Sequence, residues 1–134
     1  MSGCVLDADA LIAALDRSDA HHREAASALE AMIGAEVELL TSAVNYAEAL
    51  ARPAADPATM RAAVDAIAAL GVRTVPATEA LARDAARFRA GGISLPDGFA
   101  LATAASRSAT VASFDQRVRR AMEEAGLRAP EALA

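Results

Sequence analysis

The chain has 134 residues, about the size of one domain, so we expect a single domain spanning 1–134. Its lone cysteine excludes an internal disulfide and a cysteine-rich zinc site, and no apolar stretch reaches the ~20 residues of a membrane span. The net charge is -5 and all 13 basic residues are arginine, which excludes lysine Schiff-base chemistry and a P-loop.

Without a signal-peptide pattern at its start, the chain is expected to be cytoplasmic. Apolar residues make up 54% of it, more than half of them alanine, which favours helix. The acidic balance argues against a protein that coats nucleic acid, because such binding depends on neutralising phosphates. It leaves open an enzyme that meets nucleic acid locally, through a few arginines and a bound cation.

Short apolar runs alternate along the chain with longer segments of helical periodicity. The runs predict strands at 3–6, 37–40, 72–75 and 109–113, with a short last strand at 127–129. Apolar spacing predicts helices at about 9–15, 22–33, 42–52, 57–70, 78–90, 96–104 and 116–125. Asp9 is a candidate cap of the first helix, and Pro57 with Thr59 is expected to begin the fourth. This alternation predicts an α/β fold with a parallel sheet covered on both faces.

Four acidic residues are predicted to lie where such a sheet binds its ligands, beyond the carboxyl ends of the strands. Asp7 ends the first strand, Asp115 follows the fourth, and Asp97 falls in the first turn of a helix. Glu48 lies four residues after Val44 on the same helix, so we expect it to point inward. Clustered carboxylates repel one another unless a cation neutralises them, and hard oxygen ligands suit Mg²⁺ or Mn²⁺.

Each acid also has a purely structural explanation when taken alone. Asp7 is a polar strand end, Glu48 a solvated helix residue, and Asp97 a first-turn acid favoured by the helix dipole. Asp115 fits a helix cap equally well. Their joint occurrence favours a functional site.

Four segments carry a resemblance to a known family. They are V-L-D-A-D-A-L-I from Val5, S-A-V-N-Y-A-E from Ser42, L-P-D-G-F-A-L-A-T-A from Leu95 and V-A-S-F-D from Val111. Together they resemble the PIN-domain ribonucleases, and within these most of all the VapC toxins of bacterial toxin–antitoxin pairs. Each motif is weak alone, but all four occur in order over essentially the whole chain.

The resemblance implies a PIN-like three-layer α/β/α sandwich with a central parallel sheet of four to five strands. It makes Asp7, Glu48, Asp97 and Asp115 an acidic quartet that binds one or two Mg²⁺ or Mn²⁺ ions. Ser113 stands where the family often has threonine and is expected to hydrogen-bond a carboxylate or a metal-bound water. The bound metal activates a water for hydrolysis of an RNA phosphodiester, so no protein nucleophile is required.

The same resemblance implies partners. It predicts a tRNA or rRNA substrate, a homodimer, and a VapB-like antitoxin whose C-terminal segment lies across the acidic site. Leu11, Ile12 and the 32–33 region are expected to offer an apolar groove for an antitoxin helix.

Several other residues allow two interpretations. Asp9, where the family usually has a small hydroxyl residue or asparagine, is either an extra metal ligand or a helix cap. The pair His21 and His22 is interpreted as an exposed helix start, because adjacent side chains point apart. Cys4 is expected to be a buried apolar residue. The arginines at 117, 119 and 120 either contact RNA phosphate or form a solvated helix face.

Three other functions remain as alternatives. One is a PIN nuclease outside toxin–antitoxin biology, and another is a PIN-like scaffold without activity. The third is a haloacid-dehalogenase-like phosphatase with Asp7 as its nucleophile, which the absence of lysine disfavours.

Overall fold

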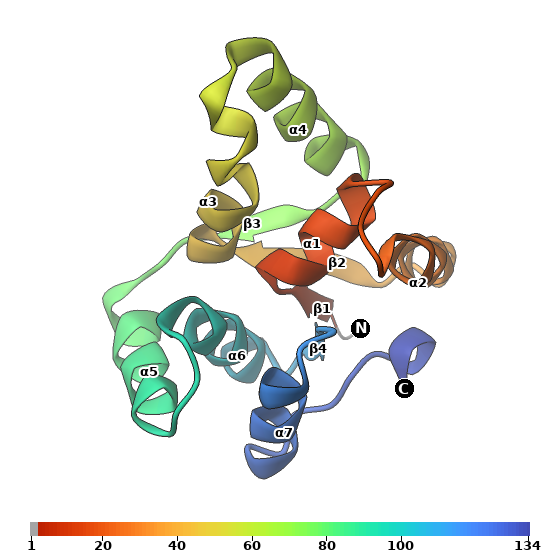
Figure 1. Cartoon of the computed structure of the whole chain (residues 1–134). Coiled ribbons are helices and arrows are strands. Elements are labelled where there is room, and N and C mark those ends of the chain that lie inside the picture. Colours follow the sequence, from red (N-terminus) through yellow and green to blue (C-terminus); the bar gives the residue numbers. More distant parts are fainter. Residues whose placement is uncertain (1–2) are drawn as a thin grey trace.

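Four short parallel strands lie at the centre of the structure, a computed structural model that describes residues 3–134 (Figure 1). They are β1 (Gly3–Leu6), β2 (Glu38–Ser42), β3 (Arg73–Val75) and β4 (Thr110–Ala112), in the order β3-β2-β1-β4. Every neighbouring pair is parallel, and Val5 of β1 pairs with both Leu40 and Val111. The first four predicted strands are therefore confirmed, with small differences at their ends.

All seven predicted helices are present in the described residues. They are α1 (Ala8–Leu15), α2 (His22–Gly34), α3 (Ala43–Ala51), α4 (Pro57–Ala69), α5 (Glu79–Ala90), α6 (Leu95–Arg107) and α7 (Gln116–Glu124). Two short 3₁₀ helices complete the chain, η1 (Pro53–Ala55) and η2 (Glu131–Leu133). None of these helices in residues 3–134 is long and apolar enough to cross a membrane.

The sheet separates two hydrophobic clusters, because successive side chains of a strand point to opposite faces. Val5 packs in one cluster with Leu101 and Val118, from α6 and α7. Cys4 and Leu6 pack in the other, which holds residues of α1, α2, α3 and α4. Figure 1 shows α5, α6 and α7 on one side of the sheet and α1 to α4 on the other. The predicted three-layer α/β/α sandwich is confirmed.

Side-chain caps determine where most helices begin. Ser42, Asp56, Thr78 and Ser94 each accept a hydrogen bond from a backbone N–H in the first turn of the following helix. Helix α4 begins at Pro57, as predicted, and Thr59 lies in its first turn, where its N–H and hydroxyl donate to the capping Asp56. Asp9 is not the cap of α1. The cap of that helix is Asp7, two residues earlier, and Asp9 falls in the first turn.

The predicted strand at 127–129 does not form. The segment lies beside β4 and makes one backbone bond to it, in which the N–H of Val111 donates to the carbonyl of Arg128 at 2.9 Å. Gly126, with a φ of 74°, turns the chain just before this segment, and Pro130 after it has no N–H to extend a ladder. The sheet therefore has four strands.

The apolar residues of α2 are not all buried. Ala25, Leu29 and Met32 fill the buried face of α2, which leaves Ile33 at its margin with 47% of its surface exposed. Cys4 is fully buried, as predicted, and burial raises the pKa of its thiol to about 11. It is therefore a packing residue rather than a reactive thiol.

Candidate active site

The carboxyl ends of β1, β2 and β4 meet at one edge of the sheet, and the predicted site residues lie there. Leu6 pairs with Ala112 at the end of the β1–β4 ladder, and the N–H of Asp7 continues it by donating to the Ala112 carbonyl at 3.2 Å. Asp7 and Ser113 thus follow directly on two adjacent strands. The chain leaves β2 at this edge into α3, which carries Glu48.

Asp7 is the most buried of the acids, with 1% of its surface exposed. Its Oδ1 accepts a hydrogen bond from the Ala10 N–H at 2.8 Å, which caps α1. Its Oδ2 is buried without a hydrogen-bond partner among the described residues. Burial raises the pKa of Asp7 to about 7, and the charges of Asp9 and Asp97 act in the same direction. A buried carboxylate oxygen with no donor is a position that a cation would satisfy.

Asp97 lies in the first turn of α6 and is half-buried. Its pKa is raised by burial and by the charges of Asp115 and Asp9, while the Ser94 hydroxyl acts in the opposite direction. The next residue, Gly98, brings α6 very close to α5, since a Cβ there would lie 2.6 Å from the Ala85 carbonyl oxygen. That helix contact helps to fix the position of Asp97.

Glu48 is exposed, so the prediction that it points inward was wrong. The buried face of α3 consists of Asn45, Ala49 and Leu50, which is rotated from the predicted stripe of Val44, Ala47 and Leu50. Glu48 therefore lies beside the buried face of α3 rather than within it. Partial burial raises its pKa, as do the charges of Asp97 and Asp9, so its carboxylate lies near the other acids.

Asp115 caps α7, and its Oδ1 accepts from the Arg117 N–H at 2.8 Å. It is half-buried, and its charge raises the pKa of Asp97. The Ser113 hydroxyl oxygen accepts from the Asp115 N–H at 3.1 Å. Ser113 also lowers the pKa of Asp7 by favouring its ionised form. The Ser113 hydroxyl thus lies between two of the predicted metal ligands.

Asp9 is exposed in the first turn of α1, and its charge raises the pKa of Asp7, Glu48 and Asp97. The structure thus gathers five acids at one edge of the sheet, which we call the acidic cluster: Asp7, Asp9, Glu48, Asp97 and Asp115. Within residues 3–134, no three side chains of His, Cys, Asp or Glu are already arranged as a metal site. The acids are close enough to interact electrostatically, but their oxygens are not gathered into a ready coordination shell.

Asn45 is a site residue that the sequence analysis quoted in a motif but did not single out. It is fully buried, and its Oδ1 accepts from the Ser42 hydroxyl at 2.6 Å. Its Nδ2 donates to the Pro96 carbonyl at 3.1 Å, immediately before Asp97. Asn45 therefore joins the start of α3 to the first turn of α6. An amide on the buried stripe of a helix, three residues before Glu48, was the signal that could have revealed it.

The three arginines near Asp115 have different environments. The Nε of Arg119 donates to the Ser113 carbonyl at 2.8 Å, and its Nη2 donates to the Leu133 carbonyl at 3.3 Å. Arg119 therefore ties the C-terminal segment to the end of β4. Arg117 and Arg120 are exposed and line a hollow of about 290 Å³ with the 91–93 turn. For these two arginines both predicted alternatives remain, which are contact with RNA phosphate and a solvated helix face.

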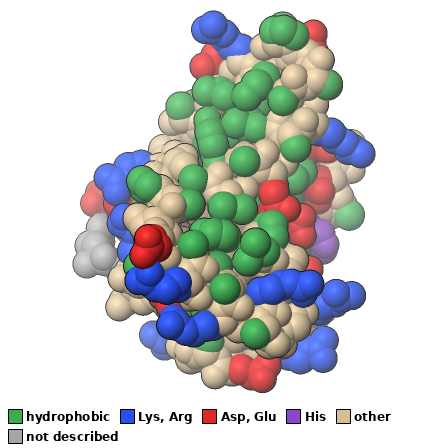
Figure 2. Space-filling model, turned by 90° about the vertical axis from the view of Figure 1, so that its left-hand side faces the viewer, with side chains coloured by type: hydrophobic (Ala, Val, Ile, Leu, Met, Phe, Trp, Pro, Cys, Tyr) green, Lys and Arg blue, Asp and Glu red, His purple; other side chains and the backbone are tan. Residues whose placement is uncertain are grey.

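The two histidines also differ. His22 begins α2, is half-buried, and its Nδ1 lies 2.7 Å from the Ala13 carbonyl oxygen. His21 is exposed and stacks on Phe114, with ring centroids 4.5 Å apart and an interplanar angle of 2°. The prediction of an exposed helix start is correct for His21 but not for His22. Figure 2 shows acidic side chains gathered on one face of the molecule, with a histidine at their border and arginines below.

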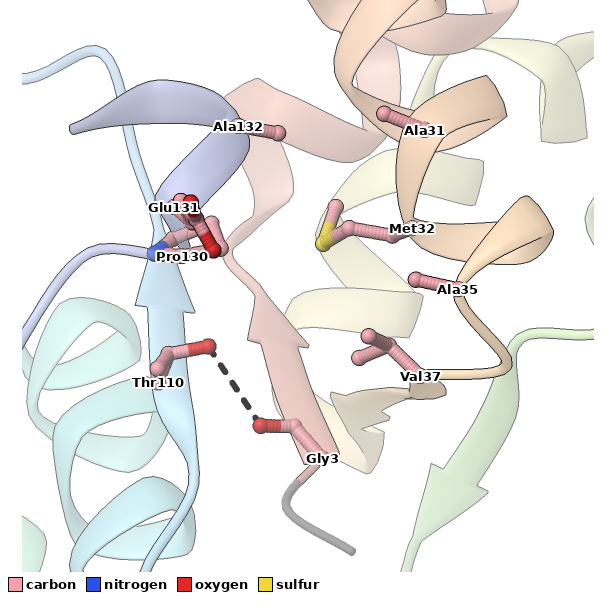
Figure 3. A pocket seen from close by; sticks show the side chains of 9 residues that line it. All are labelled: Gly3, Ala31, Met32, Ala35, Val37, Thr110, Pro130, Glu131 and Ala132. Atoms are coloured by element: carbon pink, nitrogen blue, oxygen red, sulfur yellow. Dashed lines mark hydrogen bonds between the residues drawn. The ribbon is translucent and has the colours of Figure 1, made fainter.

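A separate pocket lies at the opposite, amino-terminal edge of the sheet. It has a volume of about 370 Å³ and is lined by Gly3, Met32, Val37, Thr110 and Glu131, among others (Figure 3). Glu131 is the one acidic residue in its lining. This pocket therefore lacks the clustered acids, which places the candidate chemistry at the carboxyl edge.

Comparisons with solved structures give matches over nearly the whole chain. VapC20 of Mycobacterium tuberculosis, described as a Sarcin-Ricin loop cleaving toxin, has 16% identity and a TM-score of 0.70. That match covers 89% of this chain and 95% of VapC20. FitAcB from Neisseria gonorrhoeae has 22% identity and a TM-score of 0.70, covering 96% of this chain and 97% of its own.

A structure of FitAB bound to an IR36 DNA fragment has 22% identity and a TM-score of 0.72, covering 98% of this chain and 96% of the other. At these identities the likeness supports the fold. No protein of curated function matches the sequence significantly. The family model described as PIN domain matches residues 4–124, from β1 to the last residue of α7. The chain belongs to the PIN-domain family.

Proposed function

We propose that this protein is a metal-dependent endoribonuclease that acts as the toxin of a VapBC-type toxin–antitoxin pair. The observation that carries the proposal is the buried Asp7 carboxylate, which has one oxygen without a donor among the described residues and belongs to a cluster of five acids. Membership of the PIN-domain family supports the nuclease class, and the fold shared with VapC20, a cleaving toxin, supports the toxin role.

The donor set fits Mg²⁺ or Mn²⁺. These hard cations prefer carboxylate oxygens, which are offered by Asp7, Glu48, Asp97 and Asp115. Among the described residues of the site there is no thiolate that would compete for the metal. Burial, and to a smaller degree repulsion between the acids, raises the pKa of Asp7, Glu48 and Asp97, and a cation would stabilise their ionised forms. We propose these four acids as the ligands. Asp9 faces the same cluster and is proposed as an outer ligand through water.

The bound metal would supply an activated water and charge neutralisation on the scissile phosphate. The chain itself contributes the positions of the carboxylates. The Ala10 N–H donates to the Asp7 carboxylate and the Arg117 N–H to that of Asp115, while the Ser113 hydroxyl accepts from the Asp115 backbone N–H. In this proposal the attacking group is a water and the carboxylates serve as metal ligands, so no covalent intermediate on the protein is required.

An antitoxin partner is proposed from a groove next to the acidic cluster. Of the residues expected to form such a groove, Leu11 and Met32 are buried in the core, so the predicted location was correct only for Ile12. A groove of about 860 Å³ lies instead between α1, α3 and α4, lined by Ile12, Leu15 and several alanines. Glu48 also lines it. An amphipathic antitoxin helix in this groove would reach the acidic cluster, where a basic side chain would be attracted.

A homodimer is also proposed, on the family resemblance alone. Light scattering on the purified protein tests it, and a monomer at micromolar concentration would exclude it.

The nuclease proposal is tested with purified protein and total tRNA and rRNA. We expect cleavage with added Mg²⁺ or Mn²⁺, no cleavage in EDTA, and no cleavage by Asp7→Asn. The matched control is Asp65→Asn, which changes an exposed carboxylate on α4 and should cleave normally. Release of phosphate from a small phosphoester without RNA cleavage would favour the phosphatase alternative and end this proposal.

The toxin proposal has its own test. Expression alone should arrest growth of the host, and co-expression of a small protein encoded next to this gene should relieve the arrest and copurify. RNA cleavage without growth arrest would leave a PIN nuclease outside toxin–antitoxin biology.

A further inference from the structure

The rings of His21 and Phe114 stack on each other, and the proposed metal chemistry uses neither of them. The imidazole of His21 lies flat on the ring of Phe114, with centroids 4.5 Å apart and planes within 2° of parallel. His21 lies in the connection between α1 and α2, and Phe114 in the connection between β4 and α7. The contact therefore joins two loops at the carboxyl edge of the sheet.

The sequence places Phe114 of this stacked pair next to a proposed metal ligand. Phe114 lies between Ser113, which is close to Asp7, and Asp115, which caps α7. Glu48 approaches the cluster from α3, which follows β2 on the other side of β1. Phe114 thus follows one neighbour of β1 in the sheet, and α3 with Glu48 follows the other. A substrate strand bound over the cluster would meet the rings on one side.

The imidazole has one face available. Half of the His21 side chain, 51%, remains exposed although Phe114 covers one side of the ring. The neighbouring carboxylate of Glu24 lies 3.6 Å from Nδ1 and is itself exposed. The N–H of His21 donates to Asp19 at 2.8 Å, which fixes the backbone that carries the ring. The imidazole is therefore half exposed, and Phe114 and the backbone bond to Asp19 hold it in place.

Charge makes such a face useful to an acidic nuclease. The acidic cluster repels the phosphates of RNA, and the chain carries a net charge of -5. Arg119 is engaged with backbone carbonyls, and Arg83 and Arg87 with Glu79 and Asp84. Stacking on an aromatic ring binds a nucleobase through its π-face and does not depend on phosphate charge. Substrate affinity can thus come from the bases.

We propose that His21, supported by Phe114, is a nucleobase-binding subsite for the RNA strand that enters the acidic cluster. This inference rests on the proposed ribonuclease function. A base stacked on the open face of His21 would anchor the strand next to the metal ligands. His21 is a binding residue in this proposal and takes no part in bond cleavage.

The test compares two substitutions that keep contact with Phe114. His21→Leu places an apolar side chain against Phe114 but removes the planar face. His21→Tyr keeps an aromatic ring at this position. With an RNA oligonucleotide that spans the bond cut by the wild-type protein, we expect KM to rise about 10-fold for His21→Leu and kcat to change by less than about 2-fold. The His21→Tyr variant should stay close to wild type in both. Equal thermal midpoints for the three proteins show that the fold is kept.

A second measurement reports stacking directly in the wild-type protein. The same oligonucleotide carries 2-aminopurine at each position near the cleaved bond in turn, with Ca²⁺ in place of Mg²⁺ to slow cleavage. One position should lose fluorescence on binding, and that loss should disappear with His21→Leu and remain with His21→Tyr.

Two results would overturn the subsite. One is a wild-type protein that cuts RNA but quenches no labelled position. The other is a His21→Leu protein with unchanged KM and unchanged quenching. A wild-type protein that neither cuts nor binds RNA would overturn the ribonuclease proposal together with the subsite.

Discussion

Replacing Asp7 by asparagine should make the metal-free protein more stable at neutral pH. The carboxylate is 1% exposed, and burial raises its pKa from the ordinary 3.8 to about 7. Between these two pH values the unfolded chain has released this proton while the folded protein still holds it. Stability therefore falls as pH rises from about 4 to about 7 and stays low above that.

The size of the effect follows from the two pKa values of Asp7. They differ by roughly three units, and each unit corresponds to about 1.4 kcal/mol, so the ionised carboxylate costs on the order of 4 kcal/mol above pH 7. Small domains are stable by only about 5–15 kcal/mol, so this is a large share. Asparagine has a similar shape and caps helices as well as aspartate does, so the bond to the Ala10 N–H is kept.

The assay is urea unfolding followed by circular dichroism at several pH values from 4 to 8, in EDTA. The free energy of unfolding of the wild type should fall with pH, and that of Asp7→Asn should fall much less. A small fall remains in the variant, because the pKa values of Glu48 and Asp97 are also raised. The control Asp65→Asn should follow the wild type. If Asp7→Asn is less stable than wild type at pH 8 without metal, the electrostatic description of the site is incorrect.

The remaining predictions concern the metal, one ligand and two supporting residues. Mg²⁺ or Mn²⁺ at 100 times its Kd should raise the free energy of unfolding by about 2.7 kcal/mol, and equal melts with and without metal would contradict binding. Asp97→Asn should lose RNA cleavage in gel assays while remaining folded, and an active variant would remove it from the ligand set. Asn45→Ala leaves the Pro96 carbonyl without its partner, so it should destabilise by about 1–3 kcal/mol in urea and weaken Mn²⁺ binding about 10-fold in a direct titration. Arg119→Gln should cost about 1–3 kcal/mol and increase hydrogen exchange in the C-terminal segment, whereas Arg117→Gln, at an exposed position, should do neither.

The sequence predicted the elements of the fold well because their signals are local. A helix begins where a short polar side chain can bond to the backbone three residues later, as Ser42 and Thr78 do. It ends near residues such as Gly71, whose φ of 78° suits glycine. Errors occurred where two local signals competed. Asp7 and Asp9 are both possible caps of α1, and only the backbone position of the first turn distinguishes them.

The acids of the candidate site were also available from the sequence, since strand ends and helix starts place them at one edge of a parallel sheet. The direction of Glu48 was not. A rotation of α3 by less than a turn buries Asn45 and exposes Glu48, and that rotation depends on what α3 packs against. The roles of Asn45 and Arg119 were hidden for a similar reason, because their partners Pro96 and Leu133 are contacts of the folded chain.

The sequence by itself determined seven helices, four strands and which acids are candidates for the site, because hydrophobic periodicity and capping act within a few residues. Only the tertiary structure decided the strand order β3-β2-β1-β4, the failure of 127–129 to join the sheet, and the stacking of His21 on Phe114. These features depend on contacts between residues far apart in the chain: 93 positions separate the stacked rings, and 106 separate Cys4 from its β4 partner Thr110. No local pattern encodes such contacts, since they arise only when the helices and the sheet pack together.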